Sequence, residues 1–144
     1  MSNPSTGQTG GRTGNQPSQP TLGDSVSDED EQIGGPFHRF QALKTTDFPA
    51  ALKSFAEFKT AIARRIRWEE AEVFPEFLQR IGGGLEGTCD TLREEHREIV
   101  KQLDAIEAKL SRANPATEAE EAALQKLLAA HNHREHSIVL PALE

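Results

Sequence analysis

Three of the five histidines of the chain fall within the stretch HNHREHSIVLPALE at its C-terminal end. His131 and Glu135 are four residues apart, so on a helix they lie one turn apart on the same face. His133 points to roughly the opposite side of such a helix, and His136 lies on its flank. Imidazole nitrogens and carboxylate oxygens are together suitable ligands for a divalent transition metal. The spacing therefore selects one histidine and one carboxylate as candidate metal ligands.

Two further polar residues fall within apolar stripes of predicted helices. His96 fills a gap in the stripe of one helix, and Glu69 follows the three- and four-residue rhythm of the helix before it. A single inward histidine has an ordinary explanation as a hydrogen-bonded core residue. Buried carboxylates, however, are costly unless they are paired or bound to a metal. We therefore predict that both residues join His131 and Glu135 in one metal site.

Four amphipathic helices are predicted to position these residues. They cover about residues 36–44, 48–80, 88–112 and 117–144. No stretch alternates apolar and polar residues with a period of two, so strands are not expected. Short connections between helices place successive helices antiparallel. The predicted fold is all-α, an antiparallel up-down-up-down four-helix bundle with a disordered N-terminal tail.

Residues that favour turns separate the predicted helices. The glycines at 82–84 end the second helix, and Asn114-Pro115 ends the third. The sequence from Thr117 to Glu120 is typical of a capping box that begins the fourth helix. The apolar stripe is predicted to comprise Leu52, Phe55, Ile62, Ile66, Val73 and Phe77 in the second helix, Leu92, Ile99, Leu103, Ile106 and Leu110 in the third, and Leu124, Leu127, Leu128, Ile138 and Ala142 in the fourth.

The first 34 residues differ in composition from the rest. They are rich in Gly, Ser, Thr, Asn, Gln and Pro and contain the acidic run DEDE at 28–31. Because this segment holds almost no apolar residues, burial cannot offset the entropy lost on ordering it. We predict a disordered low-complexity acidic tail over residues 1–34 and a helical bundle over residues 35–144.

The composition also limits the class of protein. A formal net charge of −7 without a Lys/Arg cluster disfavours nucleic acid and anionic membranes as partners. No apolar run approaches the roughly 20 residues that span a bilayer, and the N-terminal stretch lacks the apolar core of a signal peptide. The single cysteine, Cys89, excludes an internal disulfide and fits a reducing compartment. We expect a cytoplasmic protein whose protein partner the sequence does not indicate.

A weak internal duplication links the two candidate glutamates. EEAEVFPEFL, starting at Glu69, aligns with EHSIVLPALE, starting at Glu135, with matching Glu, Val and Pro. Pro75 and Pro141 each follow the glutamate by six residues, where we expect the helices to be near their ends. The pattern favours two helical hairpins that pack around a shared site.

With these motifs, the region from about residue 36 to 144 resembles a hemerythrin-like domain of the HHE cation-binding family. That family is a four-helix bundle with a non-haem di-iron centre. It has a His on helix one, HxxxE on helix two, a His on helix three and HxxxE on helix four. The resemblance implies one or two iron ions as cofactor, with the two glutamates as bridges. The ligands it implies are His38, Glu69, His96, His131 and Glu135.

The chain departs from the family pattern at two positions. Arg65 stands four residues before Glu69, where the family has a histidine, and arginine stays protonated and cannot coordinate a metal. We expect one firm metal position and one weak or empty position. Alternatively, Arg65 neutralises a nearby carboxylate such as Glu69. Val100 replaces the second histidine that oxygen-carrying members have on helix three, which disfavours reversible oxygen transport.

Two functions of different class follow from these observations. The first is binding of non-haem iron, as a di-iron or half-site mononuclear centre, for sensing or handling iron, oxygen or nitric oxide, with a small diatomic gas as ligand. The alternative is a metal-free helical interaction module whose site is degenerate because of Arg65. A ferritin-like oxidase is disfavoured because no His has Glu three residues before it, and no HExxH zinc motif occurs. No set of acid, base and nucleophile defines a reaction.

Overall fold

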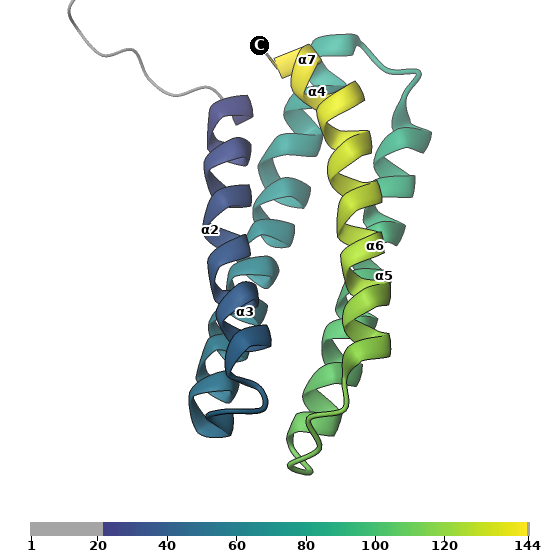
Figure 1. The fold of residues 1–144 in the computed structure, drawn as a ribbon. Helices are drawn as coiled ribbons and strands as arrows, with labels where there is room; N and C mark the ends of the chain where they lie inside the picture. The colour runs from purple at the N-terminus through teal and green to yellow at the C-terminus, as the bar shows by residue number, and fades with distance from the viewer. Residues whose placement is uncertain (1–21, 144) are drawn as a thin grey trace, which may run out of the picture.

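The fold is known from a computed structural model, which describes the backbone of residues 22–143 and the side chains of residues 33–143. Within this part all regular structure is helical, and four long helices stand side by side (Figure 1). The predicted all-α four-helix bundle is confirmed. No described helix is long and apolar enough to cross a membrane. The segments are α2 (Leu22–Leu43), α3 (Phe48–Trp68), η1 (Glu69–Val73), α4 (Phe74–Ile81), α5 (Glu86–Leu110), α6 (Glu118–Arg134), η2 (Glu135–Val139) and α7 (Leu140–Leu143).

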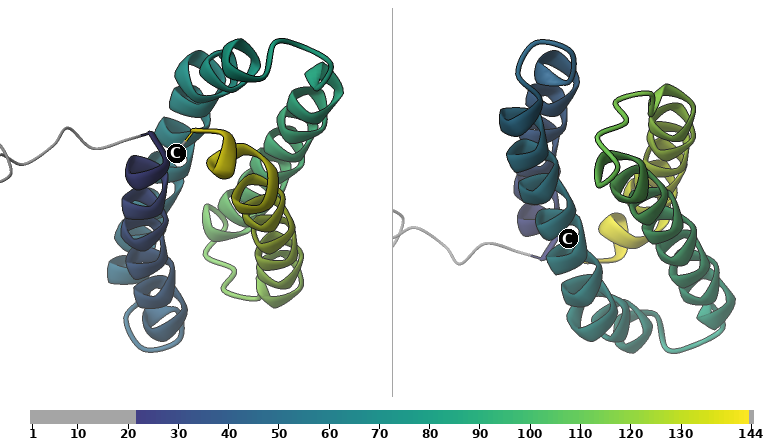
Figure 2. Two further views of the ribbon diagram at one scale, coloured as in Figure 1. Left: turned by 90° about the horizontal axis from the view of Figure 1, so that it is seen from above. Right: turned by 90° about the horizontal axis from the view of Figure 1, so that it is seen from below.

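The helices form two antiparallel hairpins. The first hairpin is α2 with the continuous helix 48–81, and the second is α5 with the continuous helix 118–143. Viewed along the bundle, the two hairpins lie beside each other (Figure 2). Successive helices run in opposite directions, so the predicted up-down-up-down order is confirmed (Figure 1). This arrangement brings helices from both hairpins to a common interior.

Glycines end the first hairpin as predicted. Gly82 has a φ of 75° and caps the helix in the left-handed conformation, and Gly83 and Gly84 follow with φ of 92° and 90°. Residues with a Cβ rarely adopt such values, whereas glycine does so without steric cost. Three consecutive positive φ angles turn the chain away from the helix and toward the second hairpin.

The first helix is longer than predicted. We placed its start at about Pro36, but α2 begins at Leu22 and contains Pro36 in its interior. Ile33 packs against the apolar core of the bundle, so tertiary contact extends the helix past the glycines and the proline. Of the predicted tail, residues 1–21 lie outside the described residues. The division of the chain at residue 34 stays a prediction.

Both helices that carry the candidate glutamates contain a π turn. The amide of Phe74 donates to the carbonyl of Glu69, and the amide of Leu140 donates to the carbonyl of Glu135, which is an i to i+5 pattern. A proline follows each turn, as the repeat showed. Proline has no N–H, and its ring clashes with the carbonyl four residues back, which a wider turn relieves. The prolines therefore explain the π turns.

The π turns change which side chains face the core. In the last helix we predicted Ile138 and Ala142 to be buried, but Val139 and Leu143 take the inward positions and Ile138 is exposed. The extra residue in the turn shifts the inward face by one position. Leu52, predicted to lie in the stripe of the second helix, is also exposed. All five residues predicted for the stripe of α5 are buried.

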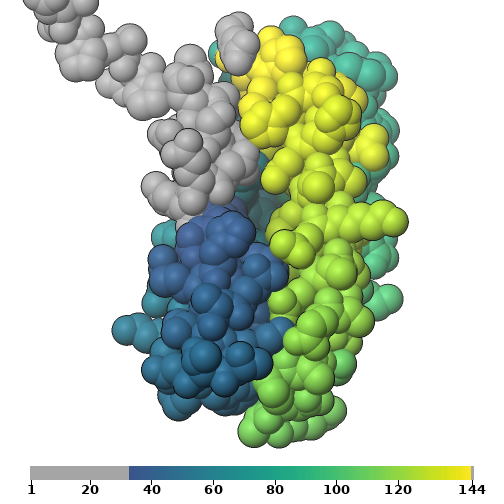
Figure 3. Space-filling view, viewed as in Figure 1, coloured from purple at the N-terminus to yellow at the C-terminus, as the bar shows by residue number. Residues whose placement is uncertain are grey.

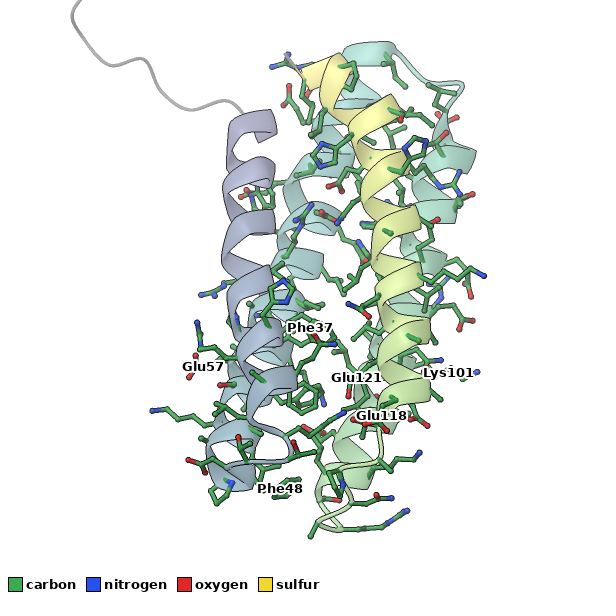
Figure 4. The ribbon with its side chains drawn as sticks, viewed as in Figure 1. Phe37, Phe48, Glu57, Lys101, Glu118 and Glu121 are labelled. Atoms are coloured by element: carbon green, nitrogen blue, oxygen red, sulfur yellow. The ribbon has the colours of Figure 1, made fainter. Side chains whose placement is uncertain are left out.

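Two apolar clusters fill the bundle, one at each end. The cluster near the α2–α3 loop includes Phe37, which points inward in Figure 4, together with Phe55 and Leu103. The cluster at the other end is built around Phe74 and Phe77. The first cluster reaches Ile62 on α3 and Ile99 on α5, whereas the second resumes at Val73 and Leu92. Between them the bundle contains a layer of buried polar residues.

A second buried polar group joins the hairpins at the end with the α2–α3 loop. The Lys44 ammonium donates to Thr117 Oγ1 at 3.1 Å, to Glu118 at 2.9 Å and to Glu121. Glu121 also accepts from the Thr117 hydroxyl and from Gln41. We call these five residues the Lys44 cluster, and Figure 4 labels two of its carboxylates at the start of α6. Thr117 makes no side-chain cap, so the predicted capping box was wrong.

Candidate metal centre

The buried polar layer contains the four residues that helical phase had placed inward. Glu69 begins η1, His96 lies on α5, His131 lies on α6, and Glu135 begins η2. All four are buried, and Glu69 and Glu135 have no exposed surface. The predicted burial is therefore confirmed, and four side chains from three helices meet at one level of the bundle. Their role as metal ligands stays a prediction.

The two histidines converge on one carboxylate. Oε1 of Glu69 lies 2.7 Å from Nε2 of His96 and 3.2 Å from Nε2 of His131. The two imidazole rings lie 4.7 Å apart between centroids. One ligand atom from each of these residues lies within 4.8 Å of the others, which is close enough for a single metal ion to touch all three. Two imidazoles and a carboxylate are suitable donors for iron, zinc or another transition metal.

Arg65 lies between the two glutamates on the side away from the histidines. Its Nε donates to Oε2 of Glu69 at 2.7 Å, and its Nη2 donates to Oε1 of Glu135 at 2.5 Å. The predicted pairing of Arg65 with Glu69 is confirmed, and the contact with Glu135 adds a second carboxylate. Each glutamate thus accepts a hydrogen bond from the guanidinium at one oxygen, and its other oxygen faces the histidines. The guanidinium therefore occupies the space between Oε2 of Glu69 and Oε1 of Glu135.

The second oxygen of Glu135 is the feature that best fits a metal. Oε2 of Glu135 is buried and is the one such side-chain atom among residues 33–143 that accepts no hydrogen bond. It lies 3.6 Å from Nε2 of His131. An unsatisfied buried oxygen costs free energy that a bound cation would return. The donors therefore fit a metal ion, with Glu135 as an additional ligand beside the group of three.

The two glutamates carry opposite pKa shifts. Burial opposes ionisation of Glu69, but hydrogen bonds from His131 and His96 and the charge of Arg65 outweigh it and hold the pKa of Glu69 below its usual range. Burial and the negative charge of Glu69 raise the pKa of Glu135 to about 9. Neighbouring carboxylates in a low dielectric ionise one after the other for this reason. Glu69 is therefore the more acidic of the two carboxyl groups that contact Arg65.

Two predicted ligands lie outside the group of three, Glu135 beside it in the buried layer and His38 away from that layer on the surface. His38 lies exposed on α2 and is not among the three residues whose donor atoms converge. His38 does line a cavity of about 320 Å³ that reaches from the outside of α2 and α6 to the polar layer. A hollow is visible between these helices in Figure 3. The walls are largely apolar and include Phe37, Phe58, Ile62, Ile99 and Leu128.

Sequence reasoning missed the outer partners of the histidines. Nδ1 of His96 lies 2.7 Å from Oε2 of Glu70, and Nδ1 of His131 lies 3.1 Å from Oε1 of Glu95. Arg134 in turn donates to Glu95 at 3.0 Å. The available signal was weak: each glutamate is adjacent in sequence to a candidate ligand. Helical phase alone does not show that Glu95 reaches across to the next helix.

Comparison with known proteins bears on the family alone. The sequence model of the hemerythrin HHE cation-binding domain matches residues 26–143. No curated protein matches the chain, and no solved structure does. The matched residues include the whole described bundle from residue 26 onward and all four members of the buried polar layer. The chain therefore belongs to the hemerythrin HHE cation-binding domain family.

Proposed function

We propose that this chain binds a single non-haem iron ion through Glu69, His96 and His131, with Glu135 as a fourth ligand. The observation that carries the proposal is the convergence of three donor atoms within 4.8 Å beside a buried oxygen that accepts no hydrogen bond. A cation at this position would satisfy that oxygen and balance the charge of the carboxylates. The mixed nitrogen and oxygen donor set suits iron.

Arg65 is the reason for proposing one ion rather than two. The guanidinium carries one positive charge and is held by Oε2 of Glu69 and Oε1 of Glu135. Neither of these two oxygens is free of the guanidinium for a second metal. Arginine keeps its proton and offers no lone pair, so it excludes a cation from its place. It also preserves the orientation of both glutamates when no metal is bound.

The cavity beside the layer supports a role in which a small molecule reaches the site. Bound iron would supply open coordination positions and redox chemistry to a ligand such as O₂ or nitric oxide. The walls are largely apolar, and Arg65 and His131 contribute to the polar end of the cavity. Sensing or handling of iron, oxygen or nitric oxide is the proposed class of function.

A metal-free interaction module is the second candidate. The contacts of Arg65 with both carboxyl groups favour it, because the guanidinium compensates part of the buried charge without a metal. The imidazoles of His96 and His131 also have carboxylate partners in this state. Among the buried side-chain nitrogen and oxygen atoms of residues 33–143, Oε2 of Glu135 is the one without a hydrogen-bond partner. The two candidates therefore differ in metal content.

Iron content per chain tests the proposal. After anaerobic loading with Fe(II) and desalting, we expect about one iron per chain by elemental analysis. His131→Ala and Glu69→Ala should lose most of it, because each removes a converging donor. His133→Ala is the matched control: it lies on the same helix but is exposed, so the iron content should not change.

Arg65→His tests why the site holds one ion. This substitution restores HxxxE on the second helix and removes the guanidinium, so we expect the iron content to rise toward about two per chain. A wild-type value near zero would favour the interaction module. A wild-type value near two would show that Arg65 does not exclude the second ion.

A further inference from the structure

Each histidine of the candidate centre is contacted at both ring nitrogens. The Nε2 atoms of His96 and His131 face Oε1 of Glu69. Their Nδ1 atoms point outward to different carboxylates, Glu70 for His96 and Glu95 for His131. The inner nitrogens therefore share one acceptor, whereas each outer nitrogen has its own.

The outer contact decides which nitrogen can bind a metal. A neutral imidazole carries its proton on one nitrogen and a lone pair on the other. A carboxylate that accepts a hydrogen bond from Nδ1 keeps the proton there, so that when a cation replaces the contact between Nε2 and Glu69 the lone pair it meets is on Nε2. The same contact fixes the rotation of the ring and increases the basicity of the free nitrogen. A histidine held in this way needs no reorientation before it binds a cation.

We propose that Glu70 and Glu95 are positioning residues that fix His96 and His131 with Nε2 available to the metal, an inference that rests on the proposed function. Glu70 follows Glu69 directly in the π turn η1, so these two adjacent residues contact the two ring nitrogens of His96. Glu95 lies on α5 and reaches His131 on α6. Each histidine is thus oriented from the helix that precedes its own in the chain.

Neighbouring groups restrain one positioning carboxylate, Glu95, and one ring, that of His96. Arg134 donates from Nε to Oε2 of Glu95 at 3.0 Å, which leaves Oε1 of Glu95 for His131. The ring of Phe74 stacks on His96 at 5.6 Å between centroids with an angle of 11° between the planes. His96 therefore has an aromatic restraint besides Glu70. We expect removal of Glu95 to weaken binding more than removal of Glu70.

Zinc affinity measured by chelator competition tests the proposal, because Zn(II) binds the same donors and is diamagnetic. Glu70→Ala and Glu95→Ala should each weaken zinc binding by about 10- to 100-fold. Glu70→Gln and Glu95→Gln keep a neutral acceptor at the same place and should show a smaller loss. The controls Glu72→Ala and Glu94→Ala change exposed neighbours of the same type and should stay within about twofold of wild type.

A second measurement separates positioning from a merely structural role. Long-range ¹H–¹⁵N spectra of the zinc-loaded wild-type chain should show both His96 and His131 protonated at Nδ1 and bound through Nε2. In each alanine variant the affected histidine should lose its protected Nδ1 proton or show mixed tautomers. Thermal unfolding of the metal-free glutamine variants should stay close to wild type, so that a loss of affinity is not a loss of folding.

The outcomes distinguish this inference from the function on which it rests. Alanine variants that bind zinc like wild type, with unchanged tautomers, would overturn the positioning role and leave the metal site in place. Coordination through Nδ1 in wild type would overturn it as well. A wild-type chain that binds neither zinc nor iron would overturn both.

Discussion

The bundle buries two cationic side chains, Lys44 and Arg65, that each contact two carboxyl groups, and their surroundings differ in how completely the buried polar atoms are hydrogen-bonded. In the Lys44 cluster the ammonium has three acceptors, and Glu121 receives hydrogen bonds at both oxygens. In the metal centre Arg65 also joins two carboxylates, but Oε2 of Glu135 accepts no hydrogen bond. The buried polar atoms of the Lys44 cluster are hydrogen-bonded without a ligand, whereas the metal centre keeps one buried oxygen that is not.

This difference shows what marks a ligand site within a protein core. A buried ion pair that satisfies all its donors and acceptors acts as a structural link, here between α2 and the start of α6. The centre combines a similar ion pair with two histidines whose Nε2 atoms face a single oxygen. Converging donors next to an unsatisfied acceptor are what a cation requires. We therefore expect substitutions in the two groups to have separate effects on folding and on metal binding.

The largest expected effect is on folding. Lys44→Met leaves the buried Glu121 without its cation, and we expect the free energy of unfolding to fall by about 3 kcal/mol. Urea denaturation of the metal-free protein measures this loss. The iron content of the folded variant should equal that of wild type, because the cluster lies at the far end of the apolar core. A matching loss of iron would mean that the two groups are not independent.

The converse effect is expected for Glu135→Gln. The amide removes a charged ligand, so we expect metal affinity to fall by about 100-fold, which corresponds to about 2.7 kcal/mol. Stability of the metal-free protein should change by less than about 1 kcal/mol, since Oε2 makes no hydrogen bond that could be lost. Metal titration and urea denaturation in the presence of a chelator measure the two quantities.

Glu121→Gln is the matched control for that substitution. It makes the same chemical change in the satisfied group, where Lys44 and Thr117 both donate to the carboxylate. We expect a loss of about 2 kcal/mol in stability and no change in metal affinity. If both amide substitutions destabilised the protein equally, the contrast between the two groups would be wrong.

The smallest effect is expected where a similar arrangement is more exposed. Lys59 contacts Asp104 at 3.0 Å and Glu107 at 2.7 Å, but both carboxylates are more than half exposed. Water screens such pairs, so Lys59→Met should lower the free energy of unfolding by less than about 1 kcal/mol. Denaturation in low and high salt measures this contribution. A loss as large as that for Lys44→Met would show that burial does not determine how much such a pair contributes to the free energy of unfolding.

Helical phase predicted the buried layer because one position on a helix fixes which face a side chain occupies. Glu69, His96, His131 and Glu135 were placed inward from the sequence, and all four are buried. The prediction from helical phase was wrong beyond Glu135, because the π turn places Val139 inward in place of Ile138. Pro75 and Pro141 carried this information, but we had predicted from them only that the helix ends are near.

Contacts between helices were much harder to predict. The spacing of Arg65 and Glu69, four residues apart on one helix, is sufficient to predict their ion pair. The second bond of Arg65 goes to Glu135 in the other hairpin. Whether this second bond forms depends on how the two hairpins are aligned along the bundle axis. Thr117 illustrates the same limit, because a contact with Lys44 replaced the local cap that the sequence favoured.

The sequence by itself determined the four-helix architecture, the family and the four polar residues that face the interior. These follow from periodicity and from residue type, which act within single helices. The tertiary structure decided that Arg65 links both glutamates, that His38 stays outside the converging group, and that Glu70 and Glu95 contact the outer nitrogens. Each of these depends on the axial and rotational register between helices. That register is set by packing of the whole core, which no local pattern encodes.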